Sequence, residues 1–353
     1  TDMSAYAIVI LVMAVAYTFY MGYSDGSNAV ATCVASHSLK PYTAIIISAA
    51  TKFVTPLLLC YLIDSYGVAV TVASLIDSAA LSNVSSELVG FIFLLSTMIS
   101  ALLWSGVSAI FNVPHSTSHT LLGGRVGGGM LAFGTGAIVW DDVGIKVILM
   151  VFLAPVICMS LGFVLEKAMV RLTAYLTRSA EKLFRGAQVV NMVVLSGAIS
   201  LNNTQKGLGV YLLAVVLTGS GAANTTQAAG QLPVWIMIVF CAAIALGLLT
   251  GGFRLIYAIG KKLFSLNLMQ SYVAQTSSMA VSVASTVFGI PISTGQVMSS
   301  SIIGVGMAQR VKGVRWTRAI RIFTGWIITF PVAMGVGAAI CALLNAIIPG
   351  GLL

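Results

Sequence analysis

The sequence predicts an all-α polytopic membrane protein built from two repeats that lie in the membrane with opposite orientations. Of its 353 residues, 58% are hydrophobic and only 8% are charged, whereas soluble domains carry about a quarter charged residues. Apolar runs long enough to cross a bilayer recur along the chain. Two pairs of polar motifs also recur in the two halves at nearly the same spacing, which indicates an internal repeat.

Ten apolar segments are predicted to be helices, because they lack the short alternating pattern of a transmembrane β-barrel. Re-entrant hairpins among them would change the number of crossings. We divide the chain into a first repeat at 1–165, a basic cytoplasmic connector at 166–187 and a second repeat at 188–353. The segments lie near 5–38, 42–63, 88–111, 116–138 and 144–164, and then near 188–220, 233–251, 264–288, 294–309 and 322–347.

The net charge of +9 follows the membrane topology. With the N-terminus outside and one crossing per segment, fourteen of the eighteen lysines and arginines fall inside, as the positive-inside rule requires. We therefore expect a multi-pass cell-membrane protein in the lipid bilayer, with both termini outside and no nucleic-acid partner. The inside cations are Lys40, Lys167, Arg171, Arg178, Lys182, Arg185, Arg254, Lys261, Lys262, Arg310, Lys312, Arg315, Arg318 and Arg321.

The repeat rests on two motifs. Ser24–Ser27 matches Asn202–Gln205, and Val113–His119 matches Ile290–Gln296; the intervals from Asp25 to Pro114 and from Asn203 to Pro291 are 89 and 88 residues. Five segments in each half, an odd number, place the halves upside down to one another. Inverted repeats with polar breaks in corresponding helices are typical of secondary transporters, whose site lies at the midplane.

The first kind of motif predicts a cation site. Small, amide and carboxylate residues interrupt an apolar helix at Asp25 and Asn28, and again at Asn202 and Asn203. Unwinding there would free oxygen atoms that replace the water around a small cation. Asp25 is the buried carboxylate that could neutralise such a cation, with sodium as the candidate metal.

The second motif, Pro-x-Ser-Thr, predicts an anion site. Proline suits the first turn of a helix, so hydroxyls and free backbone N–H groups gather at a positive helix end. Two such ends facing each other could hold a tetrahedral oxyanion, with Arg125 or Lys206 adding charge. Lys52 also lies in an apolar segment, where it could equally snorkel or pair structurally.

These motifs resemble the PiT (inorganic phosphate transporter) family, which includes a sulfate permease branch. Gly22–Ala29 resembles its G-x-N-D-x-x-N-A signature, Asn202–Lys206 its N-D-A-Q-K, and Pro114–His119 and Pro291–Gln296 its P-x-S-T-T-H. The resemblance implies cation-coupled symport of an inorganic oxyanion, driven by sodium or protons. It places Asp25, Asn28, Asn202 and Asn203 at the cation and anion centre, and assigns anion binding to Ser116, Thr117, Ser118, Ser293 and Thr294.

Departures from the family pattern bear on the substrate. Asn203 stands where the family usually has aspartate, and Arg125 lies in a stretch that is normally apolar and small. An amide can donate hydrogen bonds to sulfate, whereas a carboxylate can accept the proton of hydrogen phosphate. Sulfate is therefore narrowly favoured, with phosphate as the alternative.

A passive anion channel and an enzyme are the alternatives to a symporter. A passive anion channel could use Arg125 and Lys206 as a basic ring, but it would not need Asp25. An enzyme is not expected, because the sequence carries no zinc-ligand spacing, G-x-S-x-G elbow or nucleotide loop. No cofactor is expected beyond the coupling ion. The sequence leaves the oligomeric state open, with a homodimer as one option.

Overall fold

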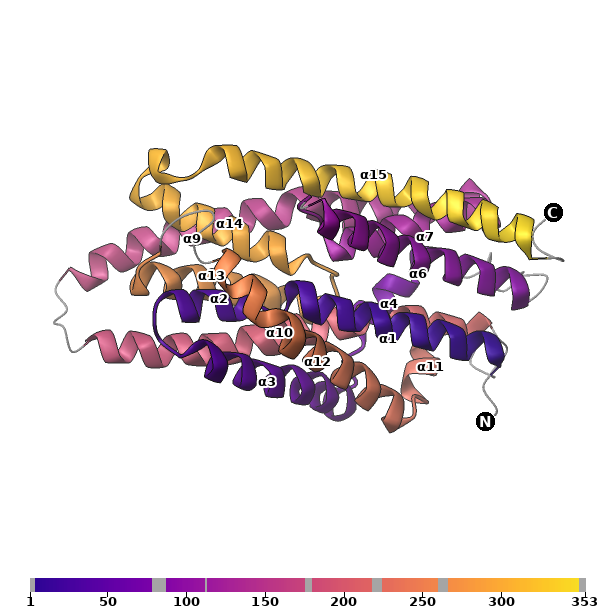
Figure 1. Ribbon diagram of the computed structural model, residues 1–353, viewed down its shortest axis with the longest axis horizontal. Helices are drawn as coiled ribbons and strands as arrows, with labels where there is room; N and C mark the ends of the chain where they lie inside the picture. The colour runs from indigo at the N-terminus through magenta and orange to yellow at the C-terminus, as the bar shows by residue number, and fades with distance from the viewer. Residues whose placement is uncertain are drawn as a thin grey trace.

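The computed structural model describes residues 4–77, 87–111, 113–174, 180–217, 224–259 and 266–348, and it is an all-helical membrane protein (Figure 1). Seven described helices are long and apolar enough to span a bilayer. They correspond to seven of the ten predicted segments. The predicted assignment of one crossing to every segment is therefore too simple.

The first half begins with a broken helix. α1 (Ala5–Asp25) and α2 (Asn28–Ala35) are separated by a turn at Gly26 and Ser27, as predicted. The remaining helices of this half are α3 (Pro41–Ile63), α4 (Gly67–Ala73), α6 (Glu87–Ile110), α7 (Thr117–Phe133), α8 (Trp140–Asp142) and α9 (Met150–Thr173).

The second half begins with α10 (Ala180–Leu217), a single helix of 38 residues. The predicted break at Asn202 and Asn203 is wrong, because α10 runs through both residues. Each of the two side chains has a hydrogen-bond partner outside the α10 backbone, and this segment lacks glycines that correspond to Gly22 and Gly26 of the first half. The other helices are α11 (Thr225–Gly230), α12 (Val234–Ile259), α13 (Leu268–Val287), α14 (Thr294–Gln309) and α15 (Trp316–Ile347).

Two short helices, α7 and α14, replace full crossings. They have 17 and 16 residues, so at 1.5 Å per residue each reaches about 25 Å, less than the roughly 30 Å of a hydrocarbon core. α13 is long enough but more polar, because it buries several serines. The segments near 116–138 and 294–309 therefore enter the membrane region without spanning it.

Close helix pairs hold the assembly together. α7 packs along α15, α14 along α9, and α1 along α12. Glycine permits the first two contacts, because a Cβ at Gly127 would overlap the carbonyl oxygen of Met334, and one at Gly304 would overlap that of Met159. Small residues that let backbones approach are the usual means of packing helices in lipid.

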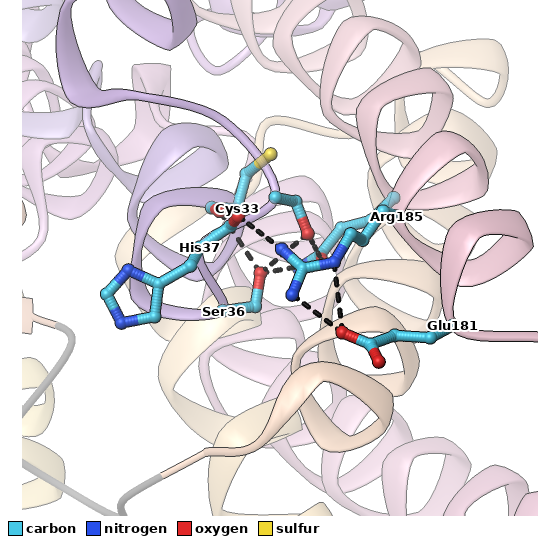
Figure 2. Close-up of polar contacts among 7 residues, drawn as sticks. Cys33, Ser36, His37, Glu181 and Arg185 are labelled. Carbon is cyan, nitrogen blue, oxygen red and sulfur yellow. Dashed lines mark hydrogen bonds and ion pairs between the residues drawn. The ribbon is translucent and has the colours of Figure 1, made fainter. Parts of the chain in front are cut away.

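The C-terminal end of α2, which is the end farther from Asp25, is bonded to the start of α10. Figure 2 shows Arg185 between the Glu181 carboxylate and the backbone carbonyl of His37; Nη2 lies 2.7 Å from Glu181 Oε1 and Nη1 lies 2.5 Å from His37 O. Ser36 Oγ donates to Cys33 O at 3.1 Å and to Gln188 Oε1 at 2.8 Å. These contacts fix the direction of α2, and with it the turn before Asn28.

The start of α1 and the end of α15 lie at the same end of the molecule, whereas the end of α9 and the start of α10 lie at the opposite end (Figure 1). α9 continues to Thr173 and α10 begins at Ala180. The predicted connector at 166–187 therefore consists largely of helix ends.

Candidate functional site

Four elements meet at the middle of the molecule: the α1–α2 turn, the N-termini of α7 and α14, and the centre of α10. Hydrogen bonds join them in pairs. Asp25 is bonded to Thr117, Asn28 to Thr294, and Lys206 to Ser118. The predicted cation and anion motifs, which lie up to 266 residues apart in the chain, are thus neighbours in space.

Asp25 ends α1 and faces the first turn of α7. Thr117 Oγ1 donates a hydrogen bond of 2.7 Å to Asp25 Oδ2. The Tyr17 hydroxyl donates to the backbone carbonyl of Thr117 at 2.5 Å, which fixes this turn of α7 against α1. The carboxylate therefore lies beside the positive end of a helix, where its charge is stabilised.

The N-termini of α7 and α14 carry the two Pro-x-Ser-Thr motifs. Ser116 is the N-cap of α7, and its Oγ accepts from the backbone N–H of His119 at 3.3 Å. Ser293 holds the same position on α14, but its side chain makes no capping bond. Both serines are buried. The Ser293 hydroxyl is therefore available to a ligand at a helix end that favours anions.

The first turn of α14 adjoins α2. Asn28 Nδ2 donates to Thr294 Oγ1 at 3.3 Å. A Cβ placed on Gly295 would have Asn28 Nδ2 as its nearest neighbour, at 3.9 Å, so this side of the helix end is uncrowded. Asn28 and Thr294 are both buried.

Lys206 is surrounded by oxygen atoms from three elements. Its Nζ donates to Ser118 Oγ at 2.6 Å, to Ile292 O at 2.7 Å and to Asn203 Oδ1 at 2.8 Å. Ser118 Oγ also donates to Ile292 O at 2.8 Å. An ammonium group has three donors, and all three are used here. Lys206 thus ties α7 and the residues before α14 to α10.

Asn202 and Asn203, neighbours at the centre of α10, contact different partners. Asn202 Nδ2 donates to Ile290 O at 3.0 Å and to Thr286 Oγ1 at 3.4 Å, which holds the connection between α13 and α14. Asn203 Oδ1 accepts from Lys206, and its buried Nδ2 has no hydrogen-bond partner among the described residues. Asn203 therefore retains a free donor, whereas the amide nitrogen of Asn202 is engaged.

Arg125 lies apart from this cluster, contrary to the expectation that it adds charge to the anion site. Its Nη2 donates to the carbonyl of Ala73 at 2.9 Å, at the end of α4. Its guanidinium lies 5.8 Å from the ring centroid of Phe93. Two turns of α7 separate Arg125 from Thr117, so the arginine faces α4 and α6 and not the helix N-termini.

Two polar residues near or within the spans were not singled out from the sequence. Gln205 Oε1 accepts from the backbone N–H groups of Val68 at 2.9 Å and Ala69 at 3.3 Å, and so caps α4. Glu166 is fully buried and its Oε1 accepts from Gln309 Nε2 at 2.5 Å, which links α9 to α14. Glu166 lies just past 164, where the apolar segment is predicted to end, whereas α9 continues to Thr173 and buries this residue.

Comparisons with known proteins identify the family of the chain. The sequence pattern of the phosphate transporter family matches residues 21–337. The chain is 32% identical to a probable low-affinity inorganic phosphate transporter of Bacillus subtilis (strain 168), over 96% of this chain and 97% of the relative. It is 33% identical to a protein of the same description from Mycobacterium bovis, over 98% of this chain and 80% of the relative.

A solved structure of the sodium-dependent phosphate transporter has the same fold. It superposes with a TM-score of 0.83 over 98% of this chain and 100% of that chain, at 17% sequence identity. The family is one of transporters and not of enzymes. With nine-tenths of its length matched by the family pattern and its helix ends gathered around one polar centre, the chain belongs to the phosphate transporter family.

Proposed function

We propose that the protein is a secondary-active symporter that imports inorganic phosphate, coupled to a gradient of sodium or protons. The observation that carries the proposal is the position of the α1–α2 turn, which places the Asp25 carboxylate against the N-terminus of α7 and Asn28 against the N-terminus of α14, two helix ends that favour an anion. The relatives named above are described as phosphate transporters. They give no support to the narrow preference for sulfate, and they favour its alternative.

The substrate would bind between the N-termini of α7 and α14. Backbone N–H groups at these ends, with the hydroxyls of Ser116, Ser293 and Thr294, supply donors suited to phosphate oxygens, whereas the Thr117 hydroxyl already donates to Asp25 and contributes through its backbone N–H. Asn28 and the free Nδ2 of Asn203 lie on the elements that border the same centre. Ser118, whose hydroxyl is engaged with Ile292 and Lys206, orients the helix ends in this scheme.

Coupling would arise at Asp25. Phosphate in the anion site and the Asp25 carboxylate repel each other. A cation bound between them reduces this repulsion, so the cation and the phosphate bind more tightly together than either does alone. Asp25 is the acidic residue of the site, and its Oδ2 is held by Thr117. Either sodium or a proton on Asp25 would serve, and the sodium-dependent description of the structural neighbour makes sodium the first ion to test.

The two halves would be inverted repeats. Support comes from exchanged contacts, since α7 packs along α15 while α14, which carries the matching motif, packs along α9. The basic end of the molecule, at the α9–α10 connection, would face the cytoplasm and both termini would be outside. Rocking of one half against the other would then expose the central site to each side in turn.

Uptake by proteoliposomes tests the proposal. We expect labelled phosphate to accumulate above its equilibrium level only when an inward sodium or proton gradient is imposed. Unlabelled phosphate should compete more strongly than sulfate. Phosphate flux that persists without any cation gradient and never exceeds equilibrium would indicate the passive anion channel, and stronger competition by sulfate would restore the sulfate assignment.

Ser293→Ala is expected to weaken phosphate binding by about 0.5–3 kcal/mol, because one hydroxyl bond to a charged partner is lost. Ser116→Ala should weaken it similarly and should also destabilise α7 by about 0.5–2 kcal/mol, because only Ser116 caps its helix. Phosphate dissociation constants and thermal unfolding of the purified variants measure the two effects.

Ser278→Ala is the matched control for these serines. Ser278 is also buried, but its hydroxyl donates to the carbonyl of Ala274 within α13 at 2.8 Å. Its removal should leave the phosphate dissociation constant unchanged. If Ser116→Ala and Ser293→Ala behave like this control while folding normally, the anion is not bound between the two helix ends.

A further inference from the structure

The positive charge available to a bound dianion comes from few residues. Lys52, Arg125 and Lys206 are the fully buried cations among the described residues of the membrane region. Removing a phosphate dianion from water is costly unless it is paired with cations and hydrogen-bond donors. Only a cation whose side chain is near the N-termini of α7 and α14 and has free donors can pair with the bound phosphate.

Two of the three are committed elsewhere. Lys206 donates to Ser118, Ile292 and Asn203, which uses all of its donors. Arg125 bonds the Ala73 carbonyl through Nη2 and lies over Phe93; its Nε and Nη1 have no partner among the described residues, but the guanidinium is held away from the helix N-termini. Moving either onto the substrate would break contacts that the protein already makes.

Lys52 is different because its whole ammonium group lacks a partner in the part of the chain that the structure describes. It lies on α3 with 0% of its surface exposed, and its Nζ makes no hydrogen bond or ion pair with any described residue. An unpaired charge in such a place is expensive. Intramembrane cations of this kind by default indicate an ion or substrate pathway.

Contacts between α3 and α10 place Lys52 beside the central site. Ser48 Oγ lies 2.8 Å from Ser196 Oγ, and Ser200 Oγ donates to the backbone carbonyl of Lys52 at 2.6 Å. Asn203, with its free Nδ2, lies one turn of α10 beyond Ser200. The backbone of α3 at Lys52 therefore lies against the stretch of α10 that leads into the cluster.

The charge of Asp25 reaches the same point. Asp25 is the acidic group that interacts electrostatically with Lys52, and it does so with Lys206 as well. The α1–α2 turn after Asp25 also carries the buried hydroxyl of Ser27, which has no partner among the described residues. α2, α3 and α10 pack on one another, so these unpartnered donors lie on elements that share one interior region.

We propose that Lys52 is a direct ligand of the transported oxyanion and supplies the positive charge of the site. The inference rests on the proposed function. Before the substrate binds, Asp25 offsets the charge of Lys52; once phosphate engages the ammonium, Asp25 loses that compensation and attracts the coupling cation. Lys52 thus links occupation of the anion site to occupation of the cation site.

Lys52→Met tests the assignment, because methionine keeps most of the volume and removes the charge. We expect the phosphate dissociation constant of the purified protein to rise by roughly tenfold or more, as for the loss of a hydrogen bond to a charged group. Lys52→Arg, which keeps the charge, should recover part of the affinity. Arg125→Met is the control, since it removes another buried cation but should leave the dissociation constant unchanged.

Equal weakening by Lys52→Met and Arg125→Met would overturn the proposal, because a loss shared with a distant cation is not a contact. An unchanged dissociation constant in Lys52→Met would overturn it as well. If Lys52→Met does not fold, Lys52→Gln is the second variant. Failure of wild type to bind phosphate would instead refute the proposed function, so the two failures are distinguishable.

The reactivity of the Lys52 amine in the wild-type protein provides a second test. Phosphate at saturating concentration should slow acetylation of Lys52 by acetic anhydride, followed by mass spectrometry, while Lys182 at the surface of α10 reacts at its usual rate. Acetylation of Lys52 that proceeds equally fast with and without bound phosphate would contradict a direct contact.

Discussion

Asp25→Asn is expected to abolish gradient-driven uptake, leaving phosphate flux at the level of empty liposomes. The substitution removes the negative charge that offsets a bound cation but keeps an oxygen that can accept from Thr117. The hydrogen bond between α1 and α7 can therefore persist while coupling is lost. The measurement is uptake of labelled phosphate into proteoliposomes under imposed sodium and proton gradients.

Binding separates a coupling defect from a broken site. In Asp25→Asn the repulsion between carboxylate and phosphate is gone, so phosphate should bind without added sodium at least as tightly as in wild type. Glu166→Gln is the control, because Glu166 is another carboxylate within a helix of the membrane region, more deeply buried than Asp25, but it contacts Gln309 of α14. In Glu166→Gln, phosphate uptake should remain coupled to the cation gradient as in wild type. Asp25→Asn with wild-type uptake and ion dependence would exclude Asp25 as the cation site.

The fold class and the convergence of the motifs could be predicted from the sequence. The motifs around Asp25, Pro114 and Pro291 combine helix-breaking residues with polar groups that hydrocarbon cannot satisfy. Such groups must find partners inside the protein, and they find one another, as in the bonds from Thr117 to Asp25 and from Asn28 to Thr294.

The prediction of a helix break in α10 is wrong for a physical reason. Asn202 and Asn203 resemble the residues after Gly22 in the first half, but polarity alone does not unwind a helix. The amide nitrogen of Asn202 is bonded to the carbonyl of Ile290 and the amide oxygen of Asn203 to the ammonium of Lys206, so each side chain has a hydrogen-bond partner while the backbone of α10 keeps its own hydrogen bonds. Tertiary partners, which a single sequence does not reveal, decided the outcome.

The sequence also does not show in which direction a buried side chain points. Arg125 and Lys206 are both buried cations near polar motifs, and their spacing could not tell that one faces Ala73 and the other Ser118. The sulfate preference assumed that the amide of Asn203 acts only on the substrate. Its oxygen in fact accepts from Lys206, so an amide at this position has a local reason to exist whichever oxyanion is carried.

Lys206→Met is expected to damage both stability and transport. Three hydrogen bonds from a charged donor are lost, each contributing about 1.5–3 kcal/mol. The buried oxygens of Ser118, Ile292 and Asn203 lose a common donor, although Ser118 still bonds Ile292. We expect a thermal midpoint that is lower by several degrees and phosphate uptake reduced by at least tenfold, measured in detergent and in proteoliposomes.

The balance between these two losses reveals what Lys206 does. If it ties the two helix ends together, thermal unfolding should shift even in phosphate-free buffer, and Lys206→Arg should recover little, because a planar guanidinium does not match three separately placed acceptors. Asn203→Asp is the companion variant, since its new carboxylate lies within reach of Lys206 and should be neutralised there. Phosphate affinity in Asn203→Asp should then fall far less than in Asn203→Asp combined with Lys206→Met. A Lys206→Met protein with an unchanged midpoint and weakened phosphate binding alone would mean that Lys206 leaves its three oxygens to contact the anion.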